Sequence, residues 1–201
     1  MKLLFAAILA LMLSTMAMAA PESYQLGEYV VSFDLNTDAT YQIQTVDPIE
    51  GSASTVYPLL IVTDNNTGAS VTITENKELQ DASMGLNREV SALRLILYKG
   101  INVTESDEMV IDGANGFALS GLPIPGSNLP EIPYYYASYW LDSNECGDCE
   151  SLSIATTNVG ITSTYSEEIT KALLNSIHIE KGEAAGTAAP SAQGGQVLPP
   201  A

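Results

Sequence analysis

The sequence predicts an α+β protein with a mainly antiparallel sheet flanked by two amphipathic helices. Short segments of alternating apolar and polar residues, separated by turn-forming residues, indicate strands that follow one another as hairpins. Two further segments, residues 86–97 and 165–177, carry apolar residues at helical spacing. Because such helices bury an apolar stripe, we expect them to cover the faces of the sheet in an α/β/α sandwich.

The N-terminus is typical of a secretory signal peptide. Lys2 is followed by an uninterrupted run of apolar and small residues, and Ala17-Met18-Ala19 is a small-x-small cleavage site. We expect cleavage after residues 1–19, a single α+β domain over residues 20–180, and a disordered Ala/Gly/Pro-rich tail over residues 181–201. An uncleaved anchor is the alternative, since the apolar run approaches the length of a membrane span.

The first half of the domain is predicted to consist of strands. Alternation over residues 29–33 indicates an opening strand, and residues 41–46 alternate in the same way. Residues 59–63 and 69–74 predict a hairpin, because the turn-rich cluster of residues 64–68 joins them.

A helix is predicted next, and it ends where Gly100 can take the left-handed conformation. Residues 108–111 and 116–120 then indicate two strands joined by a Gly-containing turn, and four prolines make residues 123–133 a long surface loop. The helix carries its apolar residues at Leu86, Val90, Leu93 and Leu97, with Ile96 beside them.

The last part of the domain is predicted as two strands and a closing helix. The strands lie in residues 134–142 and 151–159. Thr164 and Glu167 have the spacing of a capping box at the start of the helix. Its apolar stripe consists of Ile169, Leu173 and Ile177.

This order of elements resembles the PsbP/Mog1-like fold. The segment YVVSFDL is similar to its opening strand, IDGANGFALSG to its mid-chain strand pair, and ITKALLNSIHIE to its closing helix. The resemblance covers residues 24–180 and implies a non-catalytic accessory or interaction protein. The acidity, the cysteine pair and the Pro-rich loop depart from the pattern, and no ligand site is implied.

The composition fits an exported protein. The net charge is −17, from 24 acidic and 7 basic residues, so the surface repels nucleic acid and anionic lipid. Apolar residues make up 46% of the chain, which distinguishes it from a disordered acidic segment. Asn65 and Asn102 begin glycosylation sequons, and we expect both to lie on exposed loops.

The two cysteines, Cys146 and Cys149, form a C-x-x-C between the two predicted strands. A thioredoxin-type pair begins a helix, whereas this pair has acidic neighbours, which raise a thiol pKa and weaken its nucleophilicity. A structural zinc site needs about four ligands, and His178 is the single histidine. We therefore expect a disulfide that fixes a hairpin tip in an oxidising exterior, with redox catalysis and metal binding as the alternatives.

No catalytic constellation, metal site or cofactor is predicted. His178 lies between Ile177 and Ile179 and is expected to face solvent. No G-x-S-x-G motif is present, and residues 64–68 resemble a calcium loop that lacks the distal glutamate.

Aromatic residues are concentrated in the strand that follows the Pro-rich loop. Tyr134, Tyr136 and Trp140 share one face of it. They are interpreted either as core packing or as a recognition surface for a glycan or a protein.

The sequence thus predicts an exported, non-enzymatic binding or accessory protein of the cell surface or extracytoplasmic space. The partner is an unknown protein or glycan, and no stable membrane insertion is expected after signal cleavage. The alternatives are an extracytoplasmic thiol-disulfide oxidoreductase that uses the C-x-x-C pair and a structural component of the cell envelope.

We predict that the Cys146–Cys149 pair of the exported protein is a disulfide that resists mild reductant. Structural bridges have reduction potentials below about −300 mV, whereas oxidoreductases lie at about −270 to −120 mV. Thiol trapping in redox buffers of graded potential measures this value. A potential in the oxidoreductase range would favour the catalytic alternative.

Overall fold

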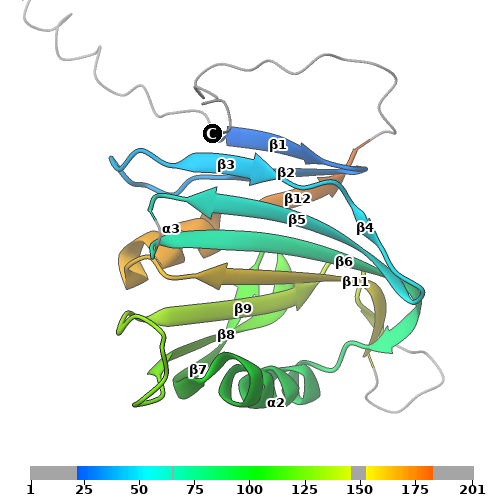
Figure 1. The fold of residues 1–201 in the computed structure, drawn as a ribbon. Helices are drawn as coiled ribbons and strands as arrows, with labels where there is room; N and C mark the ends of the chain where they lie inside the picture. Colours follow the sequence, from blue (N-terminus) through cyan, green and yellow to red (C-terminus); the bar gives the residue numbers. More distant parts are fainter. Residues whose placement is uncertain (1–21, 65, 146–152, 183–201) are drawn as a thin grey trace, which may run out of the picture.

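The computed structural model describes residues 22–64, 66–145 and 153–182 (Figure 1). All ten strand pairings in this part of the chain are antiparallel, and two helices with a short π-helical turn accompany them. The expected α+β class and the mainly antiparallel sheet are therefore confirmed. The strands form two sheets, where the sequence indicated one.

The larger sheet contains nine strands and extends across the whole domain. The predicted hairpin forms its β5–β6 pair, and the strands on either side of the cysteine segment, β9 and β11, are direct neighbours. In spatial order the sheet consists of β3 (Gln42–Thr45), β5 (Ser54–Val62), β6 (Gly68–Asp81), β11 (Ser153–Ser163), β9 (Tyr134–Trp140), β8 (Ala114–Pro123) and β7 (Ile101–Ile111), while β4 (Ile49–Glu50) pairs with β5 and β10 (Asn144–Glu145) pairs with β11.

The smaller sheet has the order β1 (Glu22–Leu26), β2 (Tyr29–Phe33) and β12 (His178–Lys181). The predicted opening strand over residues 29–33 is confirmed as β2. Its partner β1 was not predicted, and the two strands form a hairpin in which Gly27 takes a φ of +60° and reverses the chain. Strand β12 follows the closing helix directly, and it includes Lys181, the first residue of the predicted tail.

The main core lies where the smaller sheet packs on one face of the larger one. Strand β2 alternates strictly, so its inward side chains are buried while the intervening ones are half-buried. Strands β5, β6, β11 and β9 contribute the opposing side chains. The fully buried residues include Val31, Phe33, Leu59, Ile61, Val71, Ile73, Tyr139 and Ile161.

Helix α3 (Glu167–Ser176) completes this core as predicted. Leu173 and Ile177 of its stripe are buried, and Ile169 packs against the cluster. Its N-cap differs from the expectation: the Ser166 hydroxyl accepts a 3.4 Å hydrogen bond from the Ile169 amide. Thr164 is not the cap because its side chain binds the β5–β6 turn instead.

Helix α2 (Met84–Arg94) contacts the β8 and β7 end of the larger sheet and continues as the π-helical turn η1 (Leu95–Lys99). The helix and its left-handed stop at Gly100 are confirmed. The expectation that its apolar stripe faces the sheet is wrong. Leu95 packs against Phe117 and Leu119, while the predicted stripe is exposed, with exposed fractions of 50% at Leu86, 36% at Val90, 57% at Leu93 and 71% at Leu97.

Polar contacts on the inner side of α2 explain this orientation. The Asn87 side-chain amide donates to the carbonyls of Asp81 and Ser83, both at 2.9 Å. The Arg88 guanidinium pairs with Glu108 of β7 at 2.9 Å. These contacts direct one side of the helix toward the sheet, and the leucine stripe on the opposite side therefore faces outward.

Asp112 ties the two sheets together. It lies in the β7–β8 turn with a φ of +52°, and its carboxylate is 8% exposed. One carboxylate oxygen lies 2.6 Å from Nδ1 of His178, and the other accepts from the Ile179 amide at 2.9 Å. His178 faces solvent as expected, but its ring also anchors β12 to the larger sheet.

We predict a pH-dependent stabilisation from this contact. The hydrogen bond between Asp112 and His178, together with the negative charge of Asp112, raises the pKa of His178 above the ordinary value of 6.5. The folded state therefore binds the proton of His178 more tightly than the unfolded state does. The added stability is present below that value and is lost as the pH rises through the raised pKa. Urea unfolding of the wild type and of His178→Gln should differ more at about pH 5 than at about pH 9. An equal difference at both pH values would contradict the prediction.

Candidate functional site

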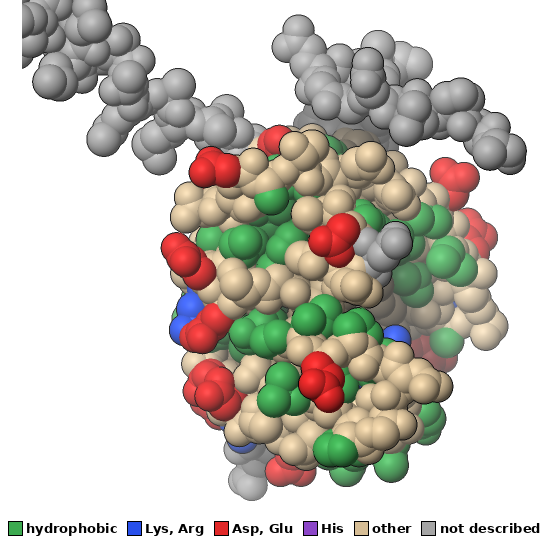
Figure 2. All heavy atoms as spheres, turned by 60° about the vertical axis from the view of Figure 1, so that its left-hand side comes forward, with side chains coloured by type: hydrophobic (Ala, Val, Ile, Leu, Met, Phe, Trp, Pro, Cys, Tyr) green, Lys and Arg blue, Asp and Glu red, His purple; other side chains and the backbone are tan. Residues whose placement is uncertain are grey.

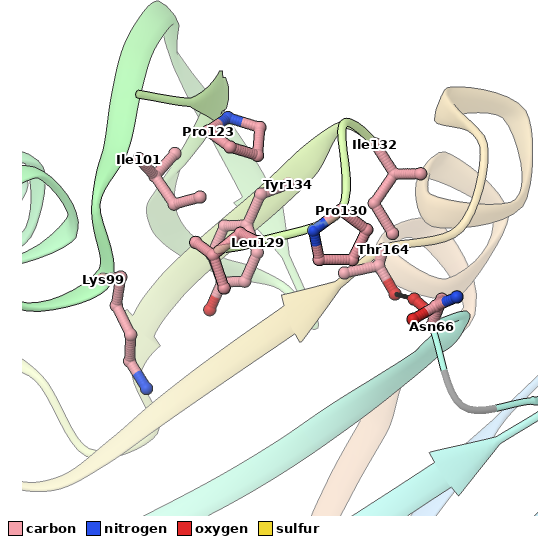
Figure 3. Close-up of a pocket in the computed structure, with 9 residues that line it drawn as sticks. All are labelled: Asn66, Lys99, Ile101, Pro123, Leu129, Pro130, Ile132, Tyr134 and Thr164. Atoms are coloured by element: carbon pink, nitrogen blue, oxygen red, sulfur yellow. Dashed lines mark hydrogen bonds between the residues drawn. The ribbon is translucent and has the colours of Figure 1, made fainter. Parts of the chain in front are cut away.

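The candidate site is a hollow of about 320 Å³ at one end of the larger sheet, which we call the Tyr134 hollow (Figure 3). It lies where the Pro-rich loop passes the ends of several strands. Its lining consists of Asn66, Lys99, Ile101, Pro123, Leu129, Pro130, Ile132, Tyr134 and Thr164.

Tight turns at the end of η1 and in the Pro-rich loop build one wall. Gly100 takes a φ of +65°, which ends η1 after Lys99 and directs the chain into β7. The Ile124 amide then donates to the Gly100 carbonyl at 2.8 Å, so the loop starts beside this turn. The loop was predicted over residues 123–133; Pro123 instead ends β8, and residues 124–133 contain no strand or helix.

The opposite wall is the β5–β6 turn, fixed by Thr164. The Thr164 hydroxyl donates to the Asn66 carbonyl at 2.9 Å and accepts from the Gly68 amide at 3.0 Å. Asp64 accepts hydrogen bonds from the amides of Asn66 and Thr67, which lower the pKa of its carboxyl group. This carboxylate therefore stabilises the turn that joins the two arms of the predicted hairpin.

Lys99 and Tyr134 bring polar chemistry to an otherwise mainly apolar hollow. Figure 3 shows the Lys99 ammonium and the Tyr134 hydroxyl on the same side of the hollow. Burial raises the pKa of Tyr134, so its hydroxyl is protonated and can donate a hydrogen bond. Acidic side chains are scattered over the face seen in Figure 2 and basic ones are few, which makes a cation at this position distinctive.

The three aromatic residues predicted as a surface have different surroundings. Tyr134 lines the hollow, and half-buried Tyr136 packs near Phe117 with ring centroids 6.2 Å apart. Trp140 is 9% exposed and packs with Ala82 and Ala155 in a separate cluster. The structure therefore brings Tyr134 alone to the hollow, and packing accounts for Trp140.

The remaining predicted positions lie elsewhere. Cys146, Cys149 and Asn65 are outside the described residues. Asn102 is exposed as expected, but it lies within β7 and not on a loop.

The described ranges contain neither a cluster of metal-binding side chains nor a helix that could span a membrane. There, no group of three or more His, Cys, Asp or Glu side chains is placed to hold a metal ion. No helix in the same ranges has the length and hydrophobicity to cross a bilayer.

Sequence reasoning identified the Pro-rich loop and Tyr134 but missed the other polar residues of the lining. Lys99, Asn66 and Thr164 come from three separate turns, and only the folded sheet brings those turns together. The one local signal was the stop at Gly100, which places Lys99 at an exposed helix end.

Comparison of the chain with protein-family models, curated proteins and solved structures found no match.

We predict that Thr164→Val destabilises the protein by about 1–3 kcal/mol, because it removes a partner of both the Asn66 carbonyl and the Gly68 amide. Thr164→Ser keeps the hydroxyl and should remain within about 0.5 kcal/mol of the wild type. Urea unfolding monitored by far-UV circular dichroism measures both variants. A valine variant as stable as the serine variant would show that the turn does not depend on this hydroxyl.

Proposed function

We propose that this chain is an exported, non-enzymatic binding protein that holds an acidic glycan residue in the Tyr134 hollow. The observation that carries the proposal is the grouping of Lys99 and Tyr134 at the edge of a mainly apolar hollow. Ligand sites commonly combine apolar walls with a few polar groups that orient the ligand.

The size and chemistry of the hollow support a sugar as the ligand. Its volume of about 320 Å³ is near the lower end of the range for small-molecule sites. Prolines 123 and 130 and the side chains of Leu129 and Ile132 offer apolar contact to one face of a ring. The Lys99 ammonium would pair with a carboxylate on the sugar, and the Tyr134 hydroxyl would bind a ring hydroxyl.

We further propose that the domain has a PsbP/Mog1-like α/β/α arrangement. Side chains of α3 belong to the same core cluster as Ala137 and Tyr139 of β9, whereas Leu95 at the end of α2 shares a cluster with Tyr136 from the other face of the same strand. This placement of the helices supports the resemblance, which in turn suggests an accessory role.

Export to the cell surface or extracytoplasmic space is the proposed setting. The signal-like residues 1–19 support it, as does the acidity of the chain. The thiol-disulfide and structural-envelope alternatives stay open, and the redox measurement above separates the first of them from the binding role.

The test uses the mature chain, residues 20–201, with a trisaccharide of galacturonic acid and its neutral galactose counterpart as probes. We expect amide shifts in NMR spectra around Tyr134 and Thr164 with the acidic probe. Lys99→Gln should weaken its binding about tenfold, the size of one lost charge-assisted contact. Lys77→Gln is the matched control, because Lys77 is exposed and donates to the Gly51 carbonyl away from the hollow.

Three outcomes would overturn the proposal. These are shifts that map elsewhere on the domain, equal losses in the two lysine variants, and no shifts at about 10 mM of either probe.

A further inference from the structure

The outward stripe of α2 is a surface that the packing of the domain leaves unused. Leu93 and Leu97 are 57% and 71% exposed, and Tyr98 beside them is 80% exposed. Figure 1 shows α2 at the margin of the domain, next to β7 and β8. An apolar ridge of this kind on a soluble domain is typical of an interaction surface.

The spacing along this ridge is that of a helix-pairing seam. Leu86, Val90, Leu93 and Leu97 follow one another at intervals of four, three and four residues. This alternation is the one that two packed helices share, and in parallel coiled coils leucine at the d positions with a β-branched residue at an a position favours two strands. Leu86 and Leu93 occupy the d positions and Val90 occupies an a position.

Charges on the two sides of the seam complement each other in a parallel pair. Glu89 immediately precedes Val90 at the a position. Arg94 immediately follows Leu93 at the d position and lies five residues after Glu89. In a parallel helix pair, these positions of the two chains face each other. Within the described part of the chain, neither of these two side chains forms an ion pair or a hydrogen bond.

We propose that two copies of this chain associate through a parallel pairing of their α2 helices. Leu86, Val90 and Leu93 would form the shared seam, and Glu89 of each copy would pair with Arg94 of the other. A two-fold axis parallel to the helices relates the copies, so both ion pairs form together.

A lipid surface fits these observations less well. Helices that lie on membranes direct a strongly charged polar face to water. Here the face opposite the stripe is directed toward the sheet, where Arg88 pairs with Glu108.

Sedimentation velocity of the mature chain, residues 20–201, tests the association from about 1 μM to about 1 mM. We expect a monomer–dimer equilibrium for the wild type. Leu93→Glu should raise the dimer Kd at least about a hundredfold without changing the far-UV circular dichroism, because it buries two carboxylates in the seam. Ile49→Glu on β4 is the matched control, since Ile49 is 56% exposed outside this surface.

A charge exchange tests the orientation of the pair. Glu89→Arg and Arg94→Glu should each raise the Kd about tenfold, since each places like charges together at two symmetric contacts. The double variant exchanges both charges and should restore the wild-type Kd. Failure of this rescue would overturn the parallel arrangement.

A wild-type chain that stays monomeric over the whole concentration range would overturn the association itself. So would a dimer that Leu93→Glu and Ile49→Glu weaken equally. Flotation with phosphatidylglycerol or phosphatidylcholine vesicles serves as the competing assay. A monomer whose vesicle binding is abolished by Leu93→Glu would assign the ridge to a lipid surface and overturn the proposal.

Discussion

The register between β9 and β11 determines what each face of the larger sheet presents. Tyr139 lies opposite Val159 and points into the main core, whereas Tyr136 lies opposite Thr162 on the other face. A slip of one residue would exchange these two sets of side chains. The main core and the contacts of Tyr134 in the hollow both depend on this register. Asp142 stabilises it where β9 ends, because its carboxylate accepts hydrogen bonds from the Thr156 and Thr157 amides of β11.

Some of the aspartates that make the chain acidic also stabilise its fold. Asp64, Asp112 and Asp142 each accept hydrogen bonds from backbone amides at a turn or a strand junction. Burial by itself would raise the pKa of Asp142, but the hydrogen bonds from Thr156 and Thr157 outweigh it and lower the pKa. An ionised carboxylate satisfies backbone donors strongly, and these aspartates therefore stabilise connections between strands while adding to the negative charge. The glutamates of strand β7 differ, because their partners are side chains: Glu108 pairs with Arg88 at 2.9 Å, and Glu105 accepts from the Ser120 hydroxyl at 3.1 Å.

Turn residues and apolar spacing in the sequence correctly predicted those elements that depend on a few neighbouring residues. The β5–β6 hairpin and the buried stripe of α3 were predicted, because turn residues and helical spacing act over a few positions. The opening hairpin was missed, since a single glycine produces its turn. The direction of the α2 stripe could not be predicted, because spacing defines an apolar side without showing which partner covers it. The Tyr134 hollow was only partly predicted, since its lining comes from turns that are distant in sequence.

Strand β7 ends the larger sheet, and in the described part of the chain no strand pairs with its outer side. An open edge of 11 residues would ordinarily be a template on which strands of other molecules could add. Here its middle carries Glu105, Asp107 and Glu108, all exposed. Pairing of the β7 strands of two copies would bring these carboxylates together, and their repulsion opposes such pairing. The charges on this edge therefore disfavour the growth of fibres by strand addition between copies of the protein.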